Sequence, residues 1–337
     1  MTDRRPVERS PINRRQLLMG VGALCAAQTP LVNAATNGLM TAADVHIDGF
    51  PTVQAVRWMG SKLEAATQGR LRIRVYHAGQ LGRENDTIDL TRFGALDITR
   101  VNFASLNNAF PLTQSFALPY MFDSVAHFRR AADGDVGRAV LRGFEERDLV
   151  GLAIYDAGSR SFYNVRGPIV EPADLHGLKL RVPPSDIFID LVRKLGANPT
   201  PLPYGEVYSA MQTHLIEGAE NNWRTFHTSR HFEVARFWSQ SDHSFSPEAV
   251  LMSRRTYDAL SAEDRELVRN TAQESVTFMR GLWDRMEIES RHLVVKSGVK
   301  VNEVDRAAFH ALARPVVESY VKRNKLEKLY EGIRALA

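Results

Sequence analysis

The chain has 337 residues, a length that usually means two domains, and its 44% hydrophobic and 24% charged residues are ordinary for a globular protein. The formal charge is +4, but five arginines and two acidic residues lie in the first 34 positions, so 38 basic residues face 37 acidic ones in the remainder. The basic residues of this remainder are scattered and form no patch or stripe, which argues against a nucleic-acid-binding protein.

The N-terminus has the pattern of an export signal. Arg14 and Arg15 precede an apolar run at 17–27, and small residues suited to cleavage follow at 32–34. The run is about half the ~20 apolar residues that a membrane-spanning helix needs. Residues 13–18 (NRRQLL) resemble a twin-arginine signal, with an ordinary secretory signal as the alternative. We therefore predict that residues 1–34 are cleaved and that the mature protein lies in the periplasm.

The only cysteine, Cys25, lies in this apolar run. Cleavage removes it, so we expect neither a disulfide nor thiol chemistry in the mature chain. A lipid-anchored N-terminus at Cys25 would need a small residue before it, and Leu24 stands there. An acylated anchor is therefore the less favoured interpretation.

Short strands alternate with amphipathic helices along the chain. Alternating apolar residues or short apolar runs predict strands at 71–75, 151–155, 178–182 and 249–252. Apolar residues at helical spacing predict helices at 53–66, before Gly69, and at 187–195, before Gly196. This alternation predicts α/β layers and a mainly parallel sheet.

The C-terminal third is predicted to be helical. Ser261 with Asp264 has the pattern of a helix start, and no proline and only Gly281 interrupt the sequence up to about 295. We predict one long helix or two nearly continuous ones; 30 residues would reach about 45 Å, enough to run across both domains. Residues 305–335 are predicted to be helical as well.

Motifs of the common enzyme classes are missing. The sequence has no nucleophile elbow, no zinc-protease motif, no phosphate-binding P-loop and no dinucleotide-binding glycine motif after a strand. His227 and His231 have a spacing that could hold a metal on one helix face, but Arg224 and Arg230 nearby would repel a cation. We expect no metal, no cofactor and no catalytic group.

One arginine occupies a position suited to ligand binding. Arg181 lies in a predicted strand that Pro183 and Pro184 bring to an end. A side chain at a strand end can project into the crevice where α/β sheets usually bind ligands. A guanidinium matches a carboxylate with two parallel hydrogen bonds. Local pattern alone leaves open a surface arginine paired with a nearby acid.

Several motifs in order carry a resemblance to a known family. The segments are GQLG (79–82), GALD (94–97), GLKLRVP (177–183), LGANPTP (195–201), GEVYSAMQT (205–213) and EGAENN (217–222). In this order they resemble the substrate-binding subunits of tripartite ATP-independent periplasmic (TRAP) transporters. The resemblance runs from about residue 43 to the C-terminus.

The resemblance implies an α/β, two-lobed periplasmic-binding-protein fold with crossing strands and a long inter-lobe helix. It implies one lobe at 35–157 plus 247–286 and the other at 158–246 plus 287–337, closing on a ligand. The expected partners are a small organic acid and the two integral membrane subunits of the transporter, with the binding protein itself a monomer.

The resemblance also implies eight ligand-binding residues: Arg181, Asn221, Arg160, Tyr204, Glu84, Asn102, Arg100 and His46. Arg181 matches the arginine that clamps the carboxylate, and Arg100 is a second candidate beside Asn102. Simpler roles stay open for three of them. Glu84 could be a carboxylate at a helix N-terminus, Arg100 could be a salt-bridged surface residue, and Tyr204 could be a core aromatic.

The predicted pocket is rich in groups that read hydroxyls. Residues 161–163 and 220–223 look similar to a subgroup associated with sugar acids, particularly hexuronates. We therefore favour glucuronate or galacturonate over C4-dicarboxylates and other hydroxy acids. The alternatives of another class are an exported enzyme, which would need an acid/base pair in the cleft, and a sensor that uses the same pocket.

Overall fold

The computed structural model describes residues 38–245 and 247–337. The predicted export signal, with Arg14, Arg15 and Cys25, lies outside the described residues. The strands are β1 (Leu39–Ala43), β2 (Arg72–Tyr76), β3 (Ile98–Asn102), β4 (Leu149–Tyr155), β5 (Ser159–Asn164), β6 (Lys179–Val182), β7 (Asn198–Pro201), β8 (Gly218–Asn221), β9 (Phe237–Phe245), β10 (Glu248–Ser253) and β11 (Lys300–Glu303).

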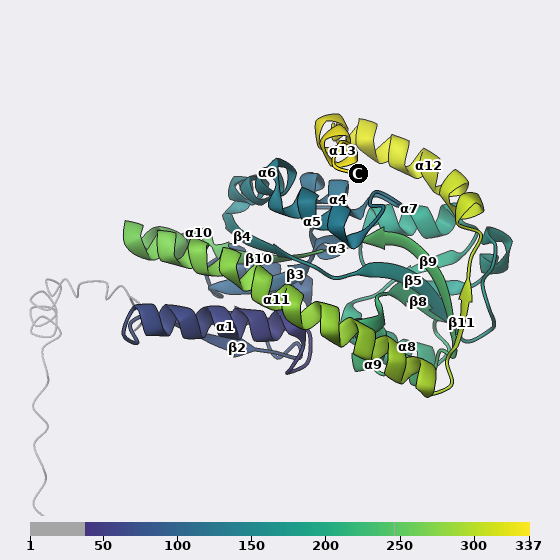
Figure 1. The fold of residues 1–337 in the computed structure, drawn as a ribbon, viewed down its shortest axis with the longest axis horizontal. Coiled ribbons are helices and arrows are strands. Elements are labelled where there is room, and N and C mark those ends of the chain that lie inside the picture. Colours follow the sequence, from purple (N-terminus) through teal and green to yellow (C-terminus); the bar gives the residue numbers. More distant parts are fainter. Residues whose placement is uncertain (1–37, 246) are drawn as a thin grey trace, which may run out of the picture. The chain divides into compact units, whose positions relative to one another are not determined.

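Helices surround these strands (Figure 1). They are α1 (Pro51–Ala66), α2 (Glu84–Arg92), α3 (Phe103–Leu106), α4 (Gln114–Ala117), α5 (Val125–Asp133), α6 (Asp135–Gly143), α7 (Asp186–Lys194), α8 (Val207–Gln212), α9 (Trp223–Thr228), α10 (Arg254–Ala259), α11 (Ala262–Lys296), α12 (Arg306–Arg323) and α13 (Glu327–Arg334). Across the described residues, none combines the length and apolar character needed to cross a bilayer.

The strands form two sheets, one in each lobe. The first has the order β2-β1-β3-β10-β4 and the second the order β11-β9-β5-β8-β6-β7. The chain passes from the first sheet to the second between β4 and β5 and returns between β9 and β10. This is the two-lobed fold with crossing strands that the resemblance implied.

The prediction of a mainly parallel sheet holds only in part, since five of the nine strand pairs among the described residues are parallel. Both sheets are mixed, and every antiparallel pair among the described strands involves β5 or β10. These are the strands that the chain enters immediately after crossing between the sheets. At each crossing, the first strand that the chain forms in the new sheet runs antiparallel to its neighbours. Local hydrophobic periodicity cannot predict the direction of a strand relative to its neighbours.

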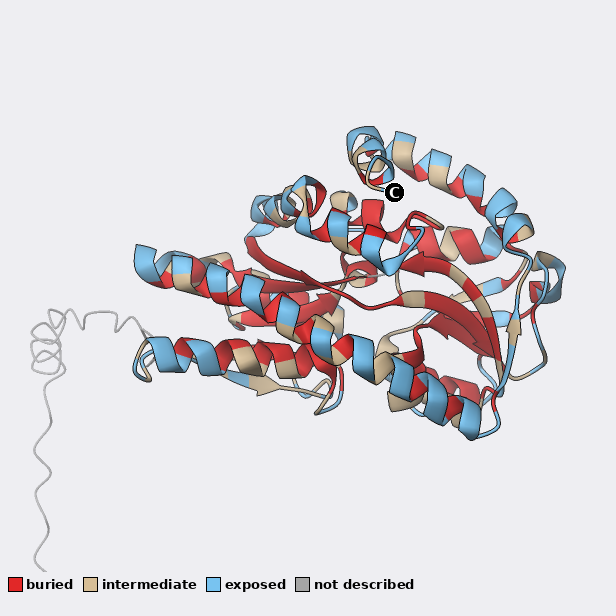
Figure 2. Cartoon of the chain, in the orientation of Figure 1, coloured by how far each residue is buried: buried red, intermediate tan, exposed pale blue. Residues whose placement is uncertain are grey.

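Local chemistry explains where the strands and helices begin and end. In β2, Arg72 and Arg74 are exposed while Ile73 and Val75 are half-buried, as the alternation predicted. Strands β4 and β10 are buried along their whole length, so β4 and the middle of β10 (249–252) are continuous apolar runs. Figure 2 shows this contrast: the strands at the centre are mostly buried, and the outer helices expose one side.

The long helix is one continuous element. The hydroxyl of Ser261 accepts a hydrogen bond from the backbone N–H of Asp264 at 3.1 Å, and α11 then runs for 35 residues with Gly281 inside it. Its first part packs on α1 and β4, and its last part packs on α9 (Figure 1). The helix therefore connects the layers around both sheets.

The C-terminal helices cover elements of both predicted lobes. Helix α12 packs on α7, and α13 packs on α6. The ring of His127 in α5 contacts the carbonyl oxygen of Ile333 at 2.8 Å, and Arg130 donates to the carbonyl of Leu336. The lobe boundaries inferred from the resemblance stay a prediction.

Candidate ligand-binding site

A cavity of about 560 Å³ lies between the two sheets. Its first wall comes from the loop after β1, residues 78–86 and the ends of β3 and β10, and its second wall from β5, β6, β8 and the short helix Tyr204–Glu206. The volume is within the usual range of small-molecule pockets. Strand ends from both sheets therefore meet where the sequence placed the candidate residues.

Arg181 lies in the second wall with its charge unmatched. The side chain is buried, and its Nε donates to the carbonyl oxygen of Leu202 at 2.9 Å. No ion pair among the described residues involves Arg181, and burial lowers the pKa of its guanidinium. Since β6 ends at Val182, before Pro183 and Pro184, the guanidinium reaches the cavity as an available donor to an anion.

Arg160 lines the same wall but is already neutralised. It donates from Nε and Nη2 to the two carboxylate oxygens of Glu220, at 2.5 and 2.8 Å. Burial opposes the charge of Glu220, but Arg160 and the ring of His243 beside it hold the pKa of Glu220 low, at about 2. Arg160 can therefore add polar contacts to a ligand, while the strongest demand for an outside anion comes from Arg181.

Two asparagines at the end of β8 present amide groups to the cavity. The Oδ1 of Asn221 accepts from Arg160 at 3.0 Å and from the backbone N–H of Asn222 at 2.9 Å. This leaves the Nδ2 of Asn221 as the donor that faces the cavity. Asn222 caps α9, and its Oδ1 accepts from the backbone N–H of Thr225 at 2.7 Å.

The first wall contains a buried cluster that we call the acidic floor: Asp44, Glu84 and Glu248 around Arg100. Arg100 donates to Asp44 through Nε at 2.9 Å, to Glu84 at 3.2 Å and to Glu248 at 2.7 Å. Although burial disfavours its charge, Asp44 and Glu248 raise the pKa of Arg100 above the ordinary value. Burial raises the pKa of Glu248 as well. Three carboxylates thus share one guanidinium.

Glu84 also ties two elements together. One oxygen accepts from the backbone N–H of Asn102 at 2.9 Å, and the other accepts from the hydroxyl of Ser105 at 2.7 Å. Because Glu84 is the first residue of α2, its charge also lies at the favourable end of that helix dipole. The side chain therefore fixes the start of α2 against the end of β3 and still lines the cavity.

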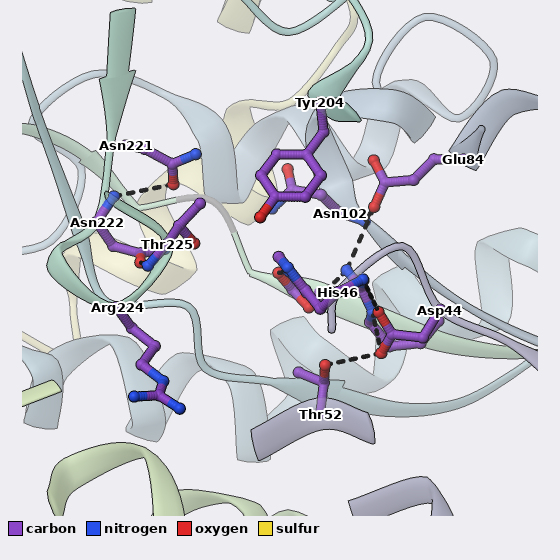
Figure 3. A network of polar contacts seen from close by, with 12 residues as sticks. Asp44, His46, Thr52, Glu84, Asn102, Tyr204, Asn221, Asn222, Arg224 and Thr225 are labelled. Atoms are coloured by element: carbon purple, nitrogen blue, oxygen red, sulfur yellow. Dashed lines mark hydrogen bonds and ion pairs between the residues drawn. The ribbon is translucent and has the colours of Figure 1, made fainter. Parts of the chain in front are cut away.

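His46 and Tyr204 meet between the two walls. Their ring centroids are 5.1 Å apart, and His46 stacks on Phe50 at 3.7 Å. Burial and the nearby charge of Arg100 lower the pKa of His46 to about 3, so the ring is neutral at physiological pH. Figure 3 shows Asn221 and Asn222 on one side, Glu84 and Asp44 on the other, and the two rings between them.

The two lobes touch at the mouth of the cavity. Arg83, just before α2, forms an ion pair with Glu206 at 2.5 Å, and both side chains are exposed. Asn107 donates to the hydroxyl of Ser185 at 3.0 Å. Next to it, the side chain of Asn108 donates to the carboxylate of Asp186 and accepts from the backbone N–H of Asp186. The structure is therefore one in which the lobes are closed against each other.

Comparison with known proteins agrees with this geometry. Residues 42–324 match the family model described as bacterial extracellular solute-binding protein, family 7 (DctP). The chain belongs to the DctP family of TRAP solute-binding proteins. Proteins of this family are extracellular, which in bacteria means periplasmic. The TRAP resemblance that the motifs implied is confirmed.

Solved structures of DctP-family proteins superpose closely. A TRAP periplasmic solute-binding protein of Bradyrhizobium sp. BTAi1, in complex with galacturonate, is 45% identical with a TM-score of 0.86, covering 88% of this chain and 99% of that one. One from Roseobacter denitrificans, with bound β-D-glucuronate, is 39% identical with the same TM-score and coverage. A solute-binding protein of Chromohalobacter salexigens is 33% identical over 86% of this chain and 87% of that protein.

Seven of the eight ligand contacts expected from the DctP resemblance line the cavity: Arg181, Asn221, Arg160, Tyr204, Glu84, Asn102 and His46. Arg100 does not line it and lies behind Glu84 and Glu248, saturated by carboxylates. The alternative of a salt-bridged residue is therefore right for its ion pairs, but Arg100 is buried and not at the surface. Which of these residues touch a ligand remains a prediction.

Sequence reasoning missed several residues of the site, among them four charged ones. Asp44 and Glu248 complete the acidic floor, Glu220 neutralises Arg160, and Arg83 lies at the mouth. A signal was present for Glu220 and Glu248, because a carboxylate within a strand that is otherwise buried needs a buried partner. Nothing local identified which arginine would be that partner.

The histidine pair in α9 and beyond has other partners. His227 contacts the hydroxyl of Ser290 at 3.1 Å, and His231 contacts the hydroxyl of Tyr163 at 2.8 Å. Over residues 38–245 and 247–337, His, Cys, Asp and Glu side chains form no group that could hold a metal ion. The pKa of His231 is lowered to about 3, chiefly by burial, so this ring packs as a neutral core residue.

Proposed function

We propose that this protein captures a hexuronate, galacturonate or glucuronate, in the periplasm and delivers it to the integral membrane subunits of a TRAP transporter. It acts as a monomeric binding protein and leaves the ligand chemically unchanged. The observation that carries the proposal is the buried guanidinium of Arg181, which faces a cavity without any carboxylate partner among the described residues. A buried charge needs a partner, and the carboxylate of the ligand supplies it.

The remaining walls suit the body of a sugar acid. Asn221 offers an amide donor near Arg181, while the acidic floor and the ring of His46 offer acceptors on the opposite wall. Sugar hydroxyls both donate and accept, so they can satisfy both walls. The ring of Tyr204 provides an apolar face between them. Relatives of similar fold with bound galacturonate or glucuronate support the same ligand class.

Closure of the two lobes would bury the ligand. In this proposal the lobes are 35–157 plus 247–286 and 158–246 plus 287–337, joined by the crossing strands and α11. The acid docks on Arg181 in the open form, and contacts from the other lobe then favour the closed form. The twin-arginine-like segment before the apolar run would export the folded protein before cleavage near residue 34.

The direct test is titration calorimetry and thermal melting of purified mature protein with galacturonate, glucuronate and succinate. A ligand at 100 times its dissociation constant adds about 2.7 kcal/mol to the free energy of unfolding. We expect this stabilisation with at least one hexuronate and much less with succinate. Absence of heat and of stabilisation with both hexuronates would contradict the proposal, and preference for succinate would assign the site to C4-dicarboxylates.

A further inference from the structure

The two walls of the cavity have opposite electrostatic character. On one wall, Arg181 is a buried cation with no ion-pair partner among the described residues. On the other, three carboxylates converge on the single guanidinium of Arg100. Glu84 and Glu248 of this acidic floor line the cavity directly, whereas Arg100 lies behind them. The floor therefore presents carboxylate oxygens, and not the guanidinium, to whatever fills the cavity.

Among the described residues, Arg100 is the only arginine or lysine that forms an ion pair with the acidic floor; Arg83, which also lines the cavity on this wall, is paired with Glu206 instead. His46 is buried beside Glu248, and its ring is neutral because burial lowers its pKa. Arg224, which is labelled in Figure 3, does not line the cavity, and its side chain points away from Glu84 and Tyr204. Asn102 and Ser105 complete the lining near the floor, and both are uncharged.

We propose that the acidic floor makes the site selective for acids that carry a single carboxylate. This inference rests on the proposed function and concerns the end of the ligand opposite Arg181. Hydroxyl groups at that end can donate to Glu84 and Glu248. A second carboxylate there can donate nothing, would lose its hydration and would face like charges in a low-dielectric cavity. Diacids of the same length are therefore rejected.

A matched pair of ligands isolates this effect. Galactonate and galactarate are both open-chain six-carbon acids with the same hydroxyl stereochemistry. They differ at one end only, where galactonate has CH₂OH and galactarate has a second carboxylate. Each is titrated by calorimetry, and where its heat is too small, its dissociation constant is obtained from displacement of bound galacturonate. We expect galactarate to bind about 100-fold more weakly than galactonate, since like charges held in contact cost several kcal/mol.

Variants then assign the effect to the floor. Glu248→Gln and Glu84→Gln keep the shape and an acceptor oxygen and remove one negative charge each. We expect each to reduce the galactarate-to-galactonate ratio of dissociation constants by about tenfold. Asp89→Asn is the control, because Asp89 is exposed on α2 and lies outside the cavity lining. This substitution removes the same formal charge as each glutamine variant. Its ratio should equal that of the wild type.

The outcomes separate this inference from the proposed function. The selectivity would be overturned if galactonate and galactarate displaced galacturonate equally, or if neither displaced it. It would also be overturned if Glu248→Gln and Glu84→Gln left the galactarate-to-galactonate ratio of dissociation constants unchanged. Binding of galacturonate would in that case still support the proposed function. Failure of the wild type to bind any hexuronate would contradict the proposed function itself. Melting curves and circular dichroism show that each variant is folded.

Discussion

Arg181 in β6 and Arg160 in β5 lie in the same wall, on either side of β8, and both are buried, but of the two only Arg160 has an acidic partner among the described residues. Arg160 is held by both oxygens of Glu220, while Arg181 has a backbone carbonyl. Burying an unmatched charge destabilises the fold, and residues retained for binding often have this cost. The charge of Arg181 therefore lowers the stability of the ligand-free fold and raises the affinity for an acidic ligand.

Arg181→Met should raise the stability of the ligand-free protein by about 1 to 3 kcal/mol, because it removes a buried charge without a partner. The same variant should bind a hexuronate at least about 30-fold more weakly, because losing a buried charge partner costs about 2 to 5 kcal/mol. Denaturant melts and calorimetry measure the two effects.

Arg160→Met is the matched control for this experiment. It leaves Glu220 buried without its cation, so it should destabilise the protein by about 3 to 5 kcal/mol. If Arg181→Met instead lost stability to the same extent as Arg160→Met, the guanidinium of Arg181 would have a structural partner and would not be the site for a carboxylate.

At the scale of elements, short segments at the cavity mouth connect the two lobes. The start of α2 reaches the short helix at 204–206 through Arg83 and Glu206, and the end of α3 reaches the start of α7 through Asn107 and Ser185. These contacts need the lobes to be together, so they contribute to closure and not to the stability of either lobe. The Arg83–Glu206 pair is exposed, which limits the size of its contribution, whereas Asn107 and Ser185 are buried.

Arg83→Ala and Glu206→Ala should each weaken hexuronate binding by about two- to fivefold, mainly through faster dissociation. An exposed ion pair contributes up to about 1 kcal/mol, and salt screens it. In a double-mutant cycle, the double variant should bind no more weakly than the weaker single variant. Fully additive losses would show that the two side chains act separately. Stopped-flow dissociation rates at low and high salt provide the measurement.

At the scale of the whole molecule, the segment that crosses between the lobes from β4 to β5 packs against the carboxyl group of Glu287 in α11. Gly158 lies between β4 and β5 at a φ of +64°, and a Cβ there would come within 2.6 Å of Oε1 of Glu287. Glu287 accepts from the indole N–H of Trp283 at 2.8 Å. Burial, with Asp284, Asp242 and Asp156 nearby, raises the pKa of Glu287 to about 7.

This shift predicts how stability depends on pH. The pKa of the folded state lies above that of the unfolded chain, so the folded state holds the proton more tightly and stability falls as pH rises from about 4.5 to 7. The loss from Glu287 should approach about 3 kcal/mol above pH 7. Glu287→Gln should therefore be more stable than wild type at pH 8 and nearly equal to it at pH 4.5.

Glu274→Gln is the control for this prediction, because Glu274 is exposed on the same helix. Its denaturant melts should match those of the wild type at both pH values. An unchanged difference between Glu287→Gln and wild type across this range would show that the carboxyl at the crossing stays ionised in the folded protein.

The elements and the principal candidate residue were accessible from the sequence. Helix α11 could be predicted because Ser261 caps it and nothing up to about residue 295 breaks it, and β6 could be predicted because its residues alternate before two prolines. Backbone preference and hydrophobic periodicity depend on residues that are close together in the sequence, so the sequence alone can predict elements from them. The position of Arg181 at a strand end follows from the same local signals.

The tertiary structure alone decided which charges are matched. Arg100 meets Glu248 across 148 positions of sequence, and Arg160 meets Glu220 across 60. The direction of β5 and β10 was likewise decided by where the chain crosses between the sheets. Ion pairs and strand partners depend on distances that exist only after the chain has folded. Arg100 and Arg181 therefore look alike in the sequence, and only the folded chain leaves one saturated by carboxylates and the other available to a ligand.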